Sequence, residues 1–361
     1  MRLKVTATMK NVILLLLATM LPHLSSEHAF SESGVEKPFY RAELIFKKTL
    51  RYIRCHSSTV TELPDGSLLA AWWNGSEEGA KDLVIRAARK ALGKDYWEPP
   101  QLIADTPGET DANPVLFTAP NGEVWLVYRV GARPFLRIMW QKSYDMGRTW
   151  QQPEALLDER EWALRSRIVV LRNSDIFIPV THRRVGSAFL YTTDGGKTWH
   201  RTKEIRTEPS NNEPSVVQRS DGSLLAYLRT FFRNPKDRFV LQSESFDNGR
   251  TWSKATVTNI RNPSSAVELL RLRNGHLALV FNDTQEGRSN LSLALSLDDA
   301  KTWSYKRVLE DASSGEFAYP TMLQSADGRI HLVYTFRRPS IKHVEVNEAW
   351  IMERPWPQLG K

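Results

Sequence analysis

The sequence predicts an all-β protein that folds as a six-bladed β-propeller. Two observations support this prediction: an eight-residue motif recurs about every fifty residues, and a tight turn followed by an apolar strand recurs with the same period. A fixed period of this length is typical of repeat architectures. Units of about four short strands can pack radially as propeller blades, which leaves only short strand edges exposed.

The motif has the form Ser/Thr-x-Asp-x-Gly-x-Thr-Trp and is known as an Asp-box. We interpret it as structural, because its Asp and Ser/Thr side chains can bond to the backbone of a tight turn while its Trp packs between blades. Trp97, about one period upstream, marks a degenerate copy. Ala300 replaces the glycine of the last copy, which predicts a relaxed turn there. The four copies are Ser143–Trp150, Thr192–Trp199, Ser245–Trp252 and Ser296–Trp303.

The second mark is an Asp-Gly or Asn-Gly dipeptide followed by an apolar run. These dipeptides favour two-residue hairpins, because both central residues of such a turn need positive φ. Residues 173–175 supply a sixth turn at the right spacing, so six blades follow. We expect the last blade to be completed by both ends of the chain, with residues 39–46 pairing near residues 343–351. The five dipeptides lie at 65–66, 121–122, 221–222, 274–275 and 327–328.

The first thirty residues are predicted to lie outside the propeller. A cationic start runs into an apolar stretch over residues 12–21, which is typical of a signal peptide and too short to span a bilayer. The sequence therefore predicts a signal peptide over residues 1–29 and a single propeller domain over residues 30–361. A secreted or periplasmic location, with no integral membrane segment after cleavage, is expected. An uncleaved N-terminal anchor is the alternative.

Composition narrows the classes of partner. The 49 Lys and Arg residues outnumber the 41 Asp and Glu residues, which favours acidic ligands. Nucleic acid is not a predicted partner, because the sequence has no Lys/Arg block and no known nucleic-acid-binding motif. No metal or other cofactor is expected, since neither metal-ligand spacing nor a phosphate-binding loop occurs. Cys55 is the only cysteine, so the domain must fold without an internal disulfide, and we expect its thiol to be buried.

These repeats and their spacing resemble the sialidase (neuraminidase) superfamily over residues 56–346. The resemblance implies a tyrosine nucleophile activated by a glutamate, three arginines that bind the carboxylate of the substrate, and an aspartate that acts as acid and base. Glu213 matches the activating glutamate, and Arg229 matches an arginine of the triad. Tyr319 matches the nucleophile, and Arg288, just ahead of the last Asp-box, matches another triad arginine.

Chemistry explains why these residue types belong together. A tyrosine with a pKa near ~10 is a poor nucleophile at neutral pH, so it needs an adjacent base such as Glu213. Arginines suit a carboxylate because the guanidinium group presents paired donors and stays charged. Each residue also has a structural alternative. In that alternative, Glu213 is a solvated turn residue and Tyr319 only packs between blades. Arg229 and Arg288 then cover apolar surface with their aliphatic stems.

The first blade departs from the family pattern, which has Arg-Ile-Pro ahead of the first hairpin. This chain has Arg54-Cys-His56 there, without the proline. Either Arg54 completes the triad through a longer loop, or His56 replaces that arginine; a structural core histidine is the third reading of His56. For the acid and base, Asp82 is the first choice and Glu78 the second, although Asp82 would otherwise begin the next strand.

The resemblance thus predicts a retaining, exo-α-sialidase-like glycoside hydrolase that releases a terminal sialic acid or a related acidic sugar. A sialylated or other acidic glycan is the expected substrate. One alternative is a propeller enzyme that acts on a different acidic sugar, with His56 in its site. The other is a non-catalytic, glycan-binding propeller.

Overall fold

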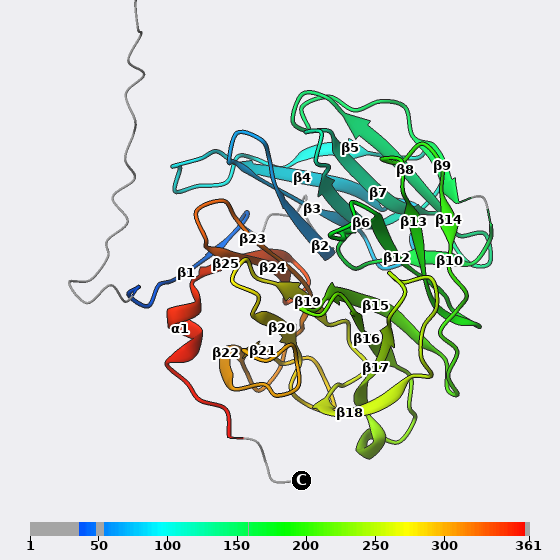
Figure 1. Cartoon of the computed structure of the whole chain (residues 1–361). Helices are drawn as coiled ribbons and strands as arrows, with labels where there is room; N and C mark the ends of the chain where they lie inside the picture. The colour runs from blue at the N-terminus through cyan, green and yellow to red at the C-terminus, as the bar shows by residue number, and fades with distance from the viewer. Residues whose placement is uncertain (1–35, 48–53, 158, 358–361) are drawn as a thin grey trace, which may run out of the picture. The chain divides into compact units, whose positions relative to one another are not determined.

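The repeat unit corresponds to one antiparallel sheet, and six such sheets stand around a central axis (Figure 1). This computed structural model describes residues 36–47, 54–157 and 159–357, and the predicted signal peptide lies outside them. The six-bladed propeller predicted from the repeats is confirmed. Within the described part of the chain, no helix has the length and apolar character needed to cross a membrane.

Blades one to three follow one another along the chain, each running from its inner to its outer strand. The inner strand of blade three is broken into two short pieces, so that this sheet has five strands. The strands are β2 (Arg54–Glu62), β3 (Leu68–Gly75), β4 (Val84–Lys90) and β5 (Gln101–Ala104); β6 (Asp111–Thr118), β7 (Val124–Val130), β8 (Arg137–Ser143) and β9 (Glu154–Leu157); and β10 (Trp162–Leu164), β11 (Val169–Val170), β12 (Ile176–His182), β13 (Gly186–Thr192) and β14 (His200–Arg201).

Blades four to six repeat the arrangement. A single 3₁₀ turn, Pro235–Asp237, interrupts the described part of blade four, and a short helix, α1 (Glu348–Met352), follows the last strand. The strands are β15 (Asn211–Gln218), β16 (Leu224–Thr230), β17 (Phe239–Ser245) and β18 (Thr256–Arg261); β19 (Glu268–Arg271), β20 (Leu277–Phe281), β21 (Asn290–Ser296) and β22 (Tyr305–Asp311); and β23 (Phe317–Gln324), β24 (Ile330–Phe336) and β25 (Ser340–Val346).

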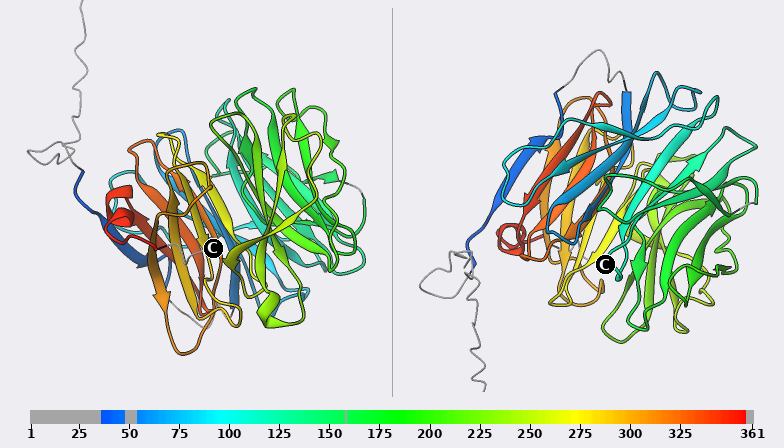
Figure 2. Two further views of the ribbon diagram at one scale, coloured as in Figure 1. Left: turned by 60° about the horizontal axis from the view of Figure 1, so that its bottom comes forward. Right: turned by 90° about the horizontal axis from the view of Figure 1, so that it is seen from above.

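The ring is closed by the N-terminal strand β1 (Tyr40–Leu44), which forms the outer edge of blade six. It pairs with β25, so that Tyr40 faces Val346 and Leu44 faces Lys342. In Figure 2 the blue first strand lies beside the red last blade. The predicted closure is therefore confirmed, with one correction. The partner strand ends at Val346, because the Asn347 side chain caps helix α1 by accepting the Trp350 amide at 3.0 Å.

The hydrophobic core is divided into six large clusters, one between each pair of neighbouring blades. Each cluster combines the inward faces of two sheets, as the alternating pattern of the strands requires. Cys55 is fully buried in the cluster between blades six and one, and burial raises the pKa of its thiol to about 12. The cysteine is thus a small core residue, as predicted.

The four Asp-boxes connect the third and fourth strands of blades two to five. In the first, Asp145 accepts bonds from the Thr149 amide at 2.8 Å and the Thr149 hydroxyl at 2.6 Å, while Ser143 accepts the Gly147 amide at 2.7 Å. The tryptophans pack on the preceding blade; Trp252, for example, stacks on Phe189. The motif is structural, as predicted.

The relaxed turn expected at Ala300 is wrong. Ala300 adopts a φ of 65°, and its amide bonds to the Ser296 hydroxyl at 2.9 Å, as in the other copies. The Thr302 amide bonds to Asp298 at 2.8 Å in the same way. The side-chain bonds of the box therefore hold an alanine in the left-handed region, which ordinarily favours glycine.

Candidate active site

Four inner strands share a bulge near their first residues. The register shifts there, and one residue in each bulge has a positive φ of 50° to 56°. Residues other than glycine seldom adopt a positive φ, and those that do are often found at functional sites. The four residues are Ser57, Asn113, Glu213 and Tyr319.

Three of these residues, Asn113, Glu213 and Tyr319, line one cavity of about 200 Å³ at this end of the central channel. A larger hollow, of about 520 Å³, lies at the other ends of the inner strands and contains none of them. The smaller cavity is the candidate active site, because it alone of the two collects the bulged side chains.

Tyr319 and Glu213 are joined directly. The Tyr319 hydroxyl donates to Glu213 Oε1 at 2.8 Å, although the two residues are 106 positions apart in the sequence. Arg229 contacts both, with Nη1 at 2.9 Å from Glu213 Oε2 and 3.0 Å from the Tyr319 oxygen. The structure therefore brings together three of the residues predicted from the family pattern.

The electrostatics of this group favour a proton on Tyr319 and a charge on Glu213. Burial and the Glu213 carboxylate raise the pKa of Tyr319 to about 12. Burial opposes ionisation of Glu213, but the Arg229 guanidinium, the hydrogen bond from Tyr319 and the charge of Arg165 together outweigh burial and hold the pKa of Glu213 below its ordinary value. At neutral pH the carboxylate is thus an acceptor poised to receive the tyrosine proton.

Arg288 lies beside Tyr319 and shares a carboxylate partner with a second arginine, Arg338. The Arg288 guanidinium carbon is 5.5 Å from the centre of the Tyr319 ring, and Arg288 pairs with Glu316 at 3.1 Å. Arg338, in the turn between β24 and β25, bonds to the same carboxylate at 2.5 and 3.1 Å. Glu316 therefore holds Arg288 and Arg338 side by side, and sequence reasoning had identified only Arg288.

The first blade contributes a histidine rather than an arginine. The His56 ring lies 4.2 Å from the Tyr319 ring, centre to centre, and its Nδ1 is 2.7 Å from the Thr335 hydroxyl. Burial, reinforced by nearby arginines that include Arg338 and Arg288, lowers the pKa of His56 well below its ordinary value. His56 is thus a neutral ring packed against the tyrosine.

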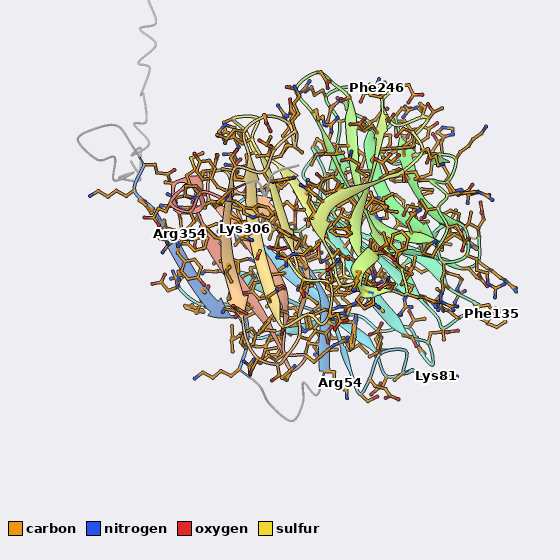
Figure 3. The ribbon with its side chains drawn as sticks, turned by 90° about the horizontal axis from the view of Figure 1, so that it is seen from below. Arg54, Lys81, Phe135, Phe246, Lys306 and Arg354 are labelled. Carbon is orange, nitrogen blue, oxygen red and sulfur yellow. The ribbon has the colours of Figure 1, made fainter. Side chains whose placement is uncertain are left out.

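Arg54 lies outside this cluster. It is exposed at the first residue of β2, and within the described part of the chain its side chain makes no hydrogen bond or ion pair. Figure 3 shows Arg54 at the lower margin of the molecule, near Lys81. The structure does not bring Arg54 to Tyr319.

The two acid/base candidates occupy different places. Glu78 lines the cavity together with Tyr319 and Glu213, and it pairs with Arg338 at 3.3 Å. Asp82 instead closes its own loop, since its carboxylate accepts the Ser76 amide at 3.1 Å and the Ser76 hydroxyl at 2.9 Å. The geometry reverses the order of preference expected from the sequence. Asp82 also does not begin a strand, because β4 starts two residues later.

Sequence reasoning missed several residues around the cavity. Arg165 is fully buried with Glu268 at 3.4 Å, and its guanidinium carbon lies 5.2 Å from the centre of the Tyr319 ring. Arg129 lines the cavity, and its Nε has no hydrogen-bond partner among the described residues. Only Asn113 had a usable signal: the dipeptide Asn-Pro at 113–114 matches Glu-Pro at 213–214 and Tyr-Pro at 319–320.

A metal centre finds no support in the described ranges, where no group of three His, Cys, Asp or Glu side chains could hold an ion. The chemistry open to the cavity is that of a tyrosine, three carboxylates and several guanidinium groups. Such a set can attack an electrophilic carbon, transfer protons and bind an anion.

Comparison with known proteins places the chain in a family. A family model described as a BNR repeat-like domain matches residues 66–332. A sialidase from Micromonospora viridifaciens is 24% identical over 172 residues, which cover 45% of this chain and 25% of that protein. A sialidase from Bacteroides fragilis (strain YCH46) is 26% identical over 204 residues, which cover 50% of this chain and 36% of that protein. The chain thus spans between 25% and 36% of the length of these curated relatives.

Among solved structures, the intramolecular trans-sialidase from Ruminococcus gnavus in complex with oseltamivir carboxylate superposes with a TM-score of 0.73. The match covers 87% of this chain and 98% of that one at 14% identity, so it speaks for the fold. The chain belongs to the family of BNR repeat-like propellers, because the family model covers most of its length. The two curated relatives that it resembles are sialidases.

Proposed function

We propose that the protein is a retaining, exo-α-sialidase-like glycoside hydrolase that acts on sialylated glycans. The observation that carries the proposal is the hydrogen bond of 2.8 Å between the Tyr319 hydroxyl and Glu213. Tyrosine nucleophiles are a recognised exception to the usual pair of carboxylates in glycoside hydrolases. From the apolar N-terminal stretch we also propose that the protein is exported.

The proposed reaction has two displacements at the anomeric carbon. Tyr319 attacks that carbon as Glu213 takes the phenolic proton, and the bond to the leaving oxygen breaks as Glu78 protonates it. Glu78 then takes a proton from water as that water attacks the same carbon. The bond between this carbon and the Tyr319 oxygen breaks, and Glu213 returns the proton to that oxygen. Two inversions give net retention. Glu78 is preferred to Asp82 because only Glu78 lines the cavity.

The carboxylate of the sugar is proposed to bind Arg229, Arg288 and Arg338. In this proposal Arg338 takes the place that the family pattern gives to an arginine of the first blade. Glu316 keeps Arg338 next to Arg288, because its carboxylate oxygens lie 3.1 Å or less from nitrogens of both guanidinium groups. Planar guanidinium groups can bind a carboxylate through paired bonds, and their charge persists at any working pH.

Hydrolysis of a fluorogenic α-sialoside tests the activity, and labelling with a 2,3-difluorinated sialosyl fluoride tests the nucleophile. We expect fluorophore release, retention of configuration at the first-formed sugar, and a mass increase on the peptide that contains Tyr319. Absence of release by the wild-type protein would overturn the proposed activity. Release with the label on another residue would overturn the assignment of Tyr319.

A matched pair of variants tests the arginine assignment. Arg338→Gln should raise KM for the sialoside by about 10-fold or more, since a charged hydrogen bond contributes about 1.5–3 kcal/mol. Arg54→Gln, an exposed arginine on the same face, should leave KM within about 2-fold. A raised KM for Arg54→Gln together with an unchanged KM for Arg338→Gln would contradict the assignment of Arg338 and would identify Arg54 as the third arginine.

A second candidate substrate follows from His56. A neutral ring stands where the family pattern has a cation, so the enzyme would act on a different nonulosonic or uronic acid. Parallel assays with a uronide and with sialosides separate the two candidates, because only the preferred sugar should give a high kcat/KM.

A further inference from the structure

A second hollow opens beside the candidate active site. It has a volume of about 420 Å³ and shares four lining residues with the first cavity. Pro134 and Arg184 complete its lining. Its walls come from the β7–β8 turn of blade two, the β12–β13 turn of blade three and the residue just before β10. The shared residues are Arg133, Leu136, Glu161 and Arg183.

The charge of this side hollow is not balanced internally. The Glu161 carboxylate faces Arg184 at 3.6 Å and His182 at 3.8 Å. Neither Arg133 nor Arg183 makes an ion pair or a side-chain hydrogen bond with any residue in the described ranges. Two guanidinium groups therefore remain available where the two cavities meet. Neighbouring cations without counter-charges attract an anionic group of a ligand.

The remaining lining is apolar. Leu136, which lines the hollow, is buried, and its neighbour in sequence, Phe135, is 58% exposed. The Arg160 guanidinium carbon lies 5.0 Å from the centre of the Phe135 ring, a cation–π contact that restrains this aromatic side chain. Figure 3 shows Phe135 at the right margin of the molecule. Apolar walls with a few placed polar groups are typical of pockets that bind small organic ligands.

We propose that the side hollow binds a second anionic group of the glycan, one sugar beyond the residue held at Tyr319. This inference rests on the proposed function. The ligand class is an oligosaccharide with two anionic groups, in which the first carboxylate meets Arg229 and its neighbours and the second meets Arg133 and Arg183. The second group is a carboxylate or a sulfate, since guanidinium groups bind either through paired bonds.

The test measures binding to the Tyr319→Phe variant by calorimetry, so that turnover does not interfere. The probes are sialyllactose, with one carboxylate; disialyllactose, with two; and a sialyllactose that carries one sulfate on the adjacent sugar. We expect at least one doubly anionic probe to bind about 10-fold more tightly than sialyllactose. The probe with the larger advantage identifies the second anion.

Variants then locate the effect. Adding Arg133→Gln and Arg183→Gln together should reduce the ratio of affinities to about one. Adding Arg54→Gln, which removes a charge from the same face outside both cavities, should preserve the ratio. Equal affinity for all probes, or an advantage that survives the double substitution, would overturn the second anion site and leave the proposed activity standing. Binding of none of the probes would instead overturn the proposed function and this site with it.

Discussion

The Asp-box turns and the inner-strand bulges lie at opposite ends of the propeller, and they repeat from blade to blade in different ways. At one end the Asp-boxes repeat both their backbone and their side chains, with the same pattern of bonds in all four. At the other end the inner-strand bulges repeat only their backbone, and their side chains are Ser57, Asn113, Glu213 and Tyr319. Figure 3 shows the separation, with Phe246 of the third box at the top and Arg54 at the bottom.

This difference teaches where stability and chemistry lie. An Asp-box satisfies its own turn, so its residues are interchangeable between blades. Each bulge holds one residue at a positive φ, a backbone conformation that costs about 1–3 kcal/mol, and three of the four bulges direct that residue's side chain into a shared cavity. The surrounding structure secures it; the Glu213 amide, for example, donates to the Thr181 hydroxyl of the neighbouring blade at 2.9 Å. Repetition of the backbone with varied side chains thus assembles a site from distant blades.

The largest expected effect is at a bulge. Tyr319→Phe should lower kcat by about 10³-fold or more, because it removes the nucleophilic oxygen. The ring packing against His56 and Arg165 remains, so the free energy of unfolding should change by less than about 1 kcal/mol. Activity assays and denaturant titrations check the pair of outcomes. A large loss of stability would break the distinction between the two ends.

The next effect is at an Asp-box. Asp247→Ala removes acceptors for the Thr251 amide at 2.9 Å and for the Thr251 hydroxyl at 2.6 Å. We expect unfolding to become easier by about 1–3 kcal/mol, with kcat per folded molecule unchanged. Lys254→Ala, just beyond the box, is the control and should have little effect on either quantity. A fall in kcat without a fall in stability would give the box a chemical role.

A smaller effect on stability is expected at Glu43, in the strand β1 that closes the ring. Glu43 in β1 bonds to His343 in β25 at 3.2 Å and to Lys90 in β4. Burial alone would raise its pKa, but these two partners lower the pKa of Glu43 to about 2. The stability that Glu43 contributes is therefore present above about pH 4.5 and is lost as the pH falls toward 2.

Glu43→Gln should accordingly destabilise the protein by about 1–2 kcal/mol at neutral pH, after allowance for solvent screening. The difference between wild type and variant should shrink as the pH falls from about 4.5 to 2. Hydrogen exchange should show protection lost by the same amount at the Asp-boxes and at the bulged strands. Unequal losses would mean that the two ends open independently.

The smallest effect tests the alanine in the last Asp-box. Ala300→Gly should stabilise the protein by up to about 1 kcal/mol, because glycine adopts a φ near 65° without steric cost. Thermal unfolding is sufficient to determine the sign. A clear destabilisation would show that contacts of the Ala300 methyl group with the core between blades four and five outweigh the backbone preference.

Most of the fold could be predicted from sequence, because turns and strands recur with a period that local chemistry sets. The site was less accessible. Glu213, Arg229, Arg288 and Tyr319 could be identified because the resemblance supplied their pattern. Arg338 could not, because an arginine in a hairpin turn looks like any surface cation until Glu316 fixes it beside Arg288.

The order of Asp82 and Glu78 was also beyond sequence reasoning. Both lie in one short loop, and their roles differ only through the path of its backbone. Asp82 turns back to Ser76, which leaves Glu78 at the cavity. Which of the two carboxylates lines the cavity depends on a few side-chain hydrogen bonds rather than on a repeated pattern, so the periodicity of the sequence does not predict it.

Ring closure has a consequence for folding during translation. The Phe39 amide bonds to the Asn347 side chain across 308 positions of the chain, so β1 precedes all six inner strands in the chain but is paired only after β25 has been made. During translation β1 has no partner until β25 has been made, and contacts of such long sequence separation form slowly. An unpaired strand edge of this kind can associate with other chains in the meantime. The blades can assemble in order as they emerge, but the ring can close only after β25 has been made.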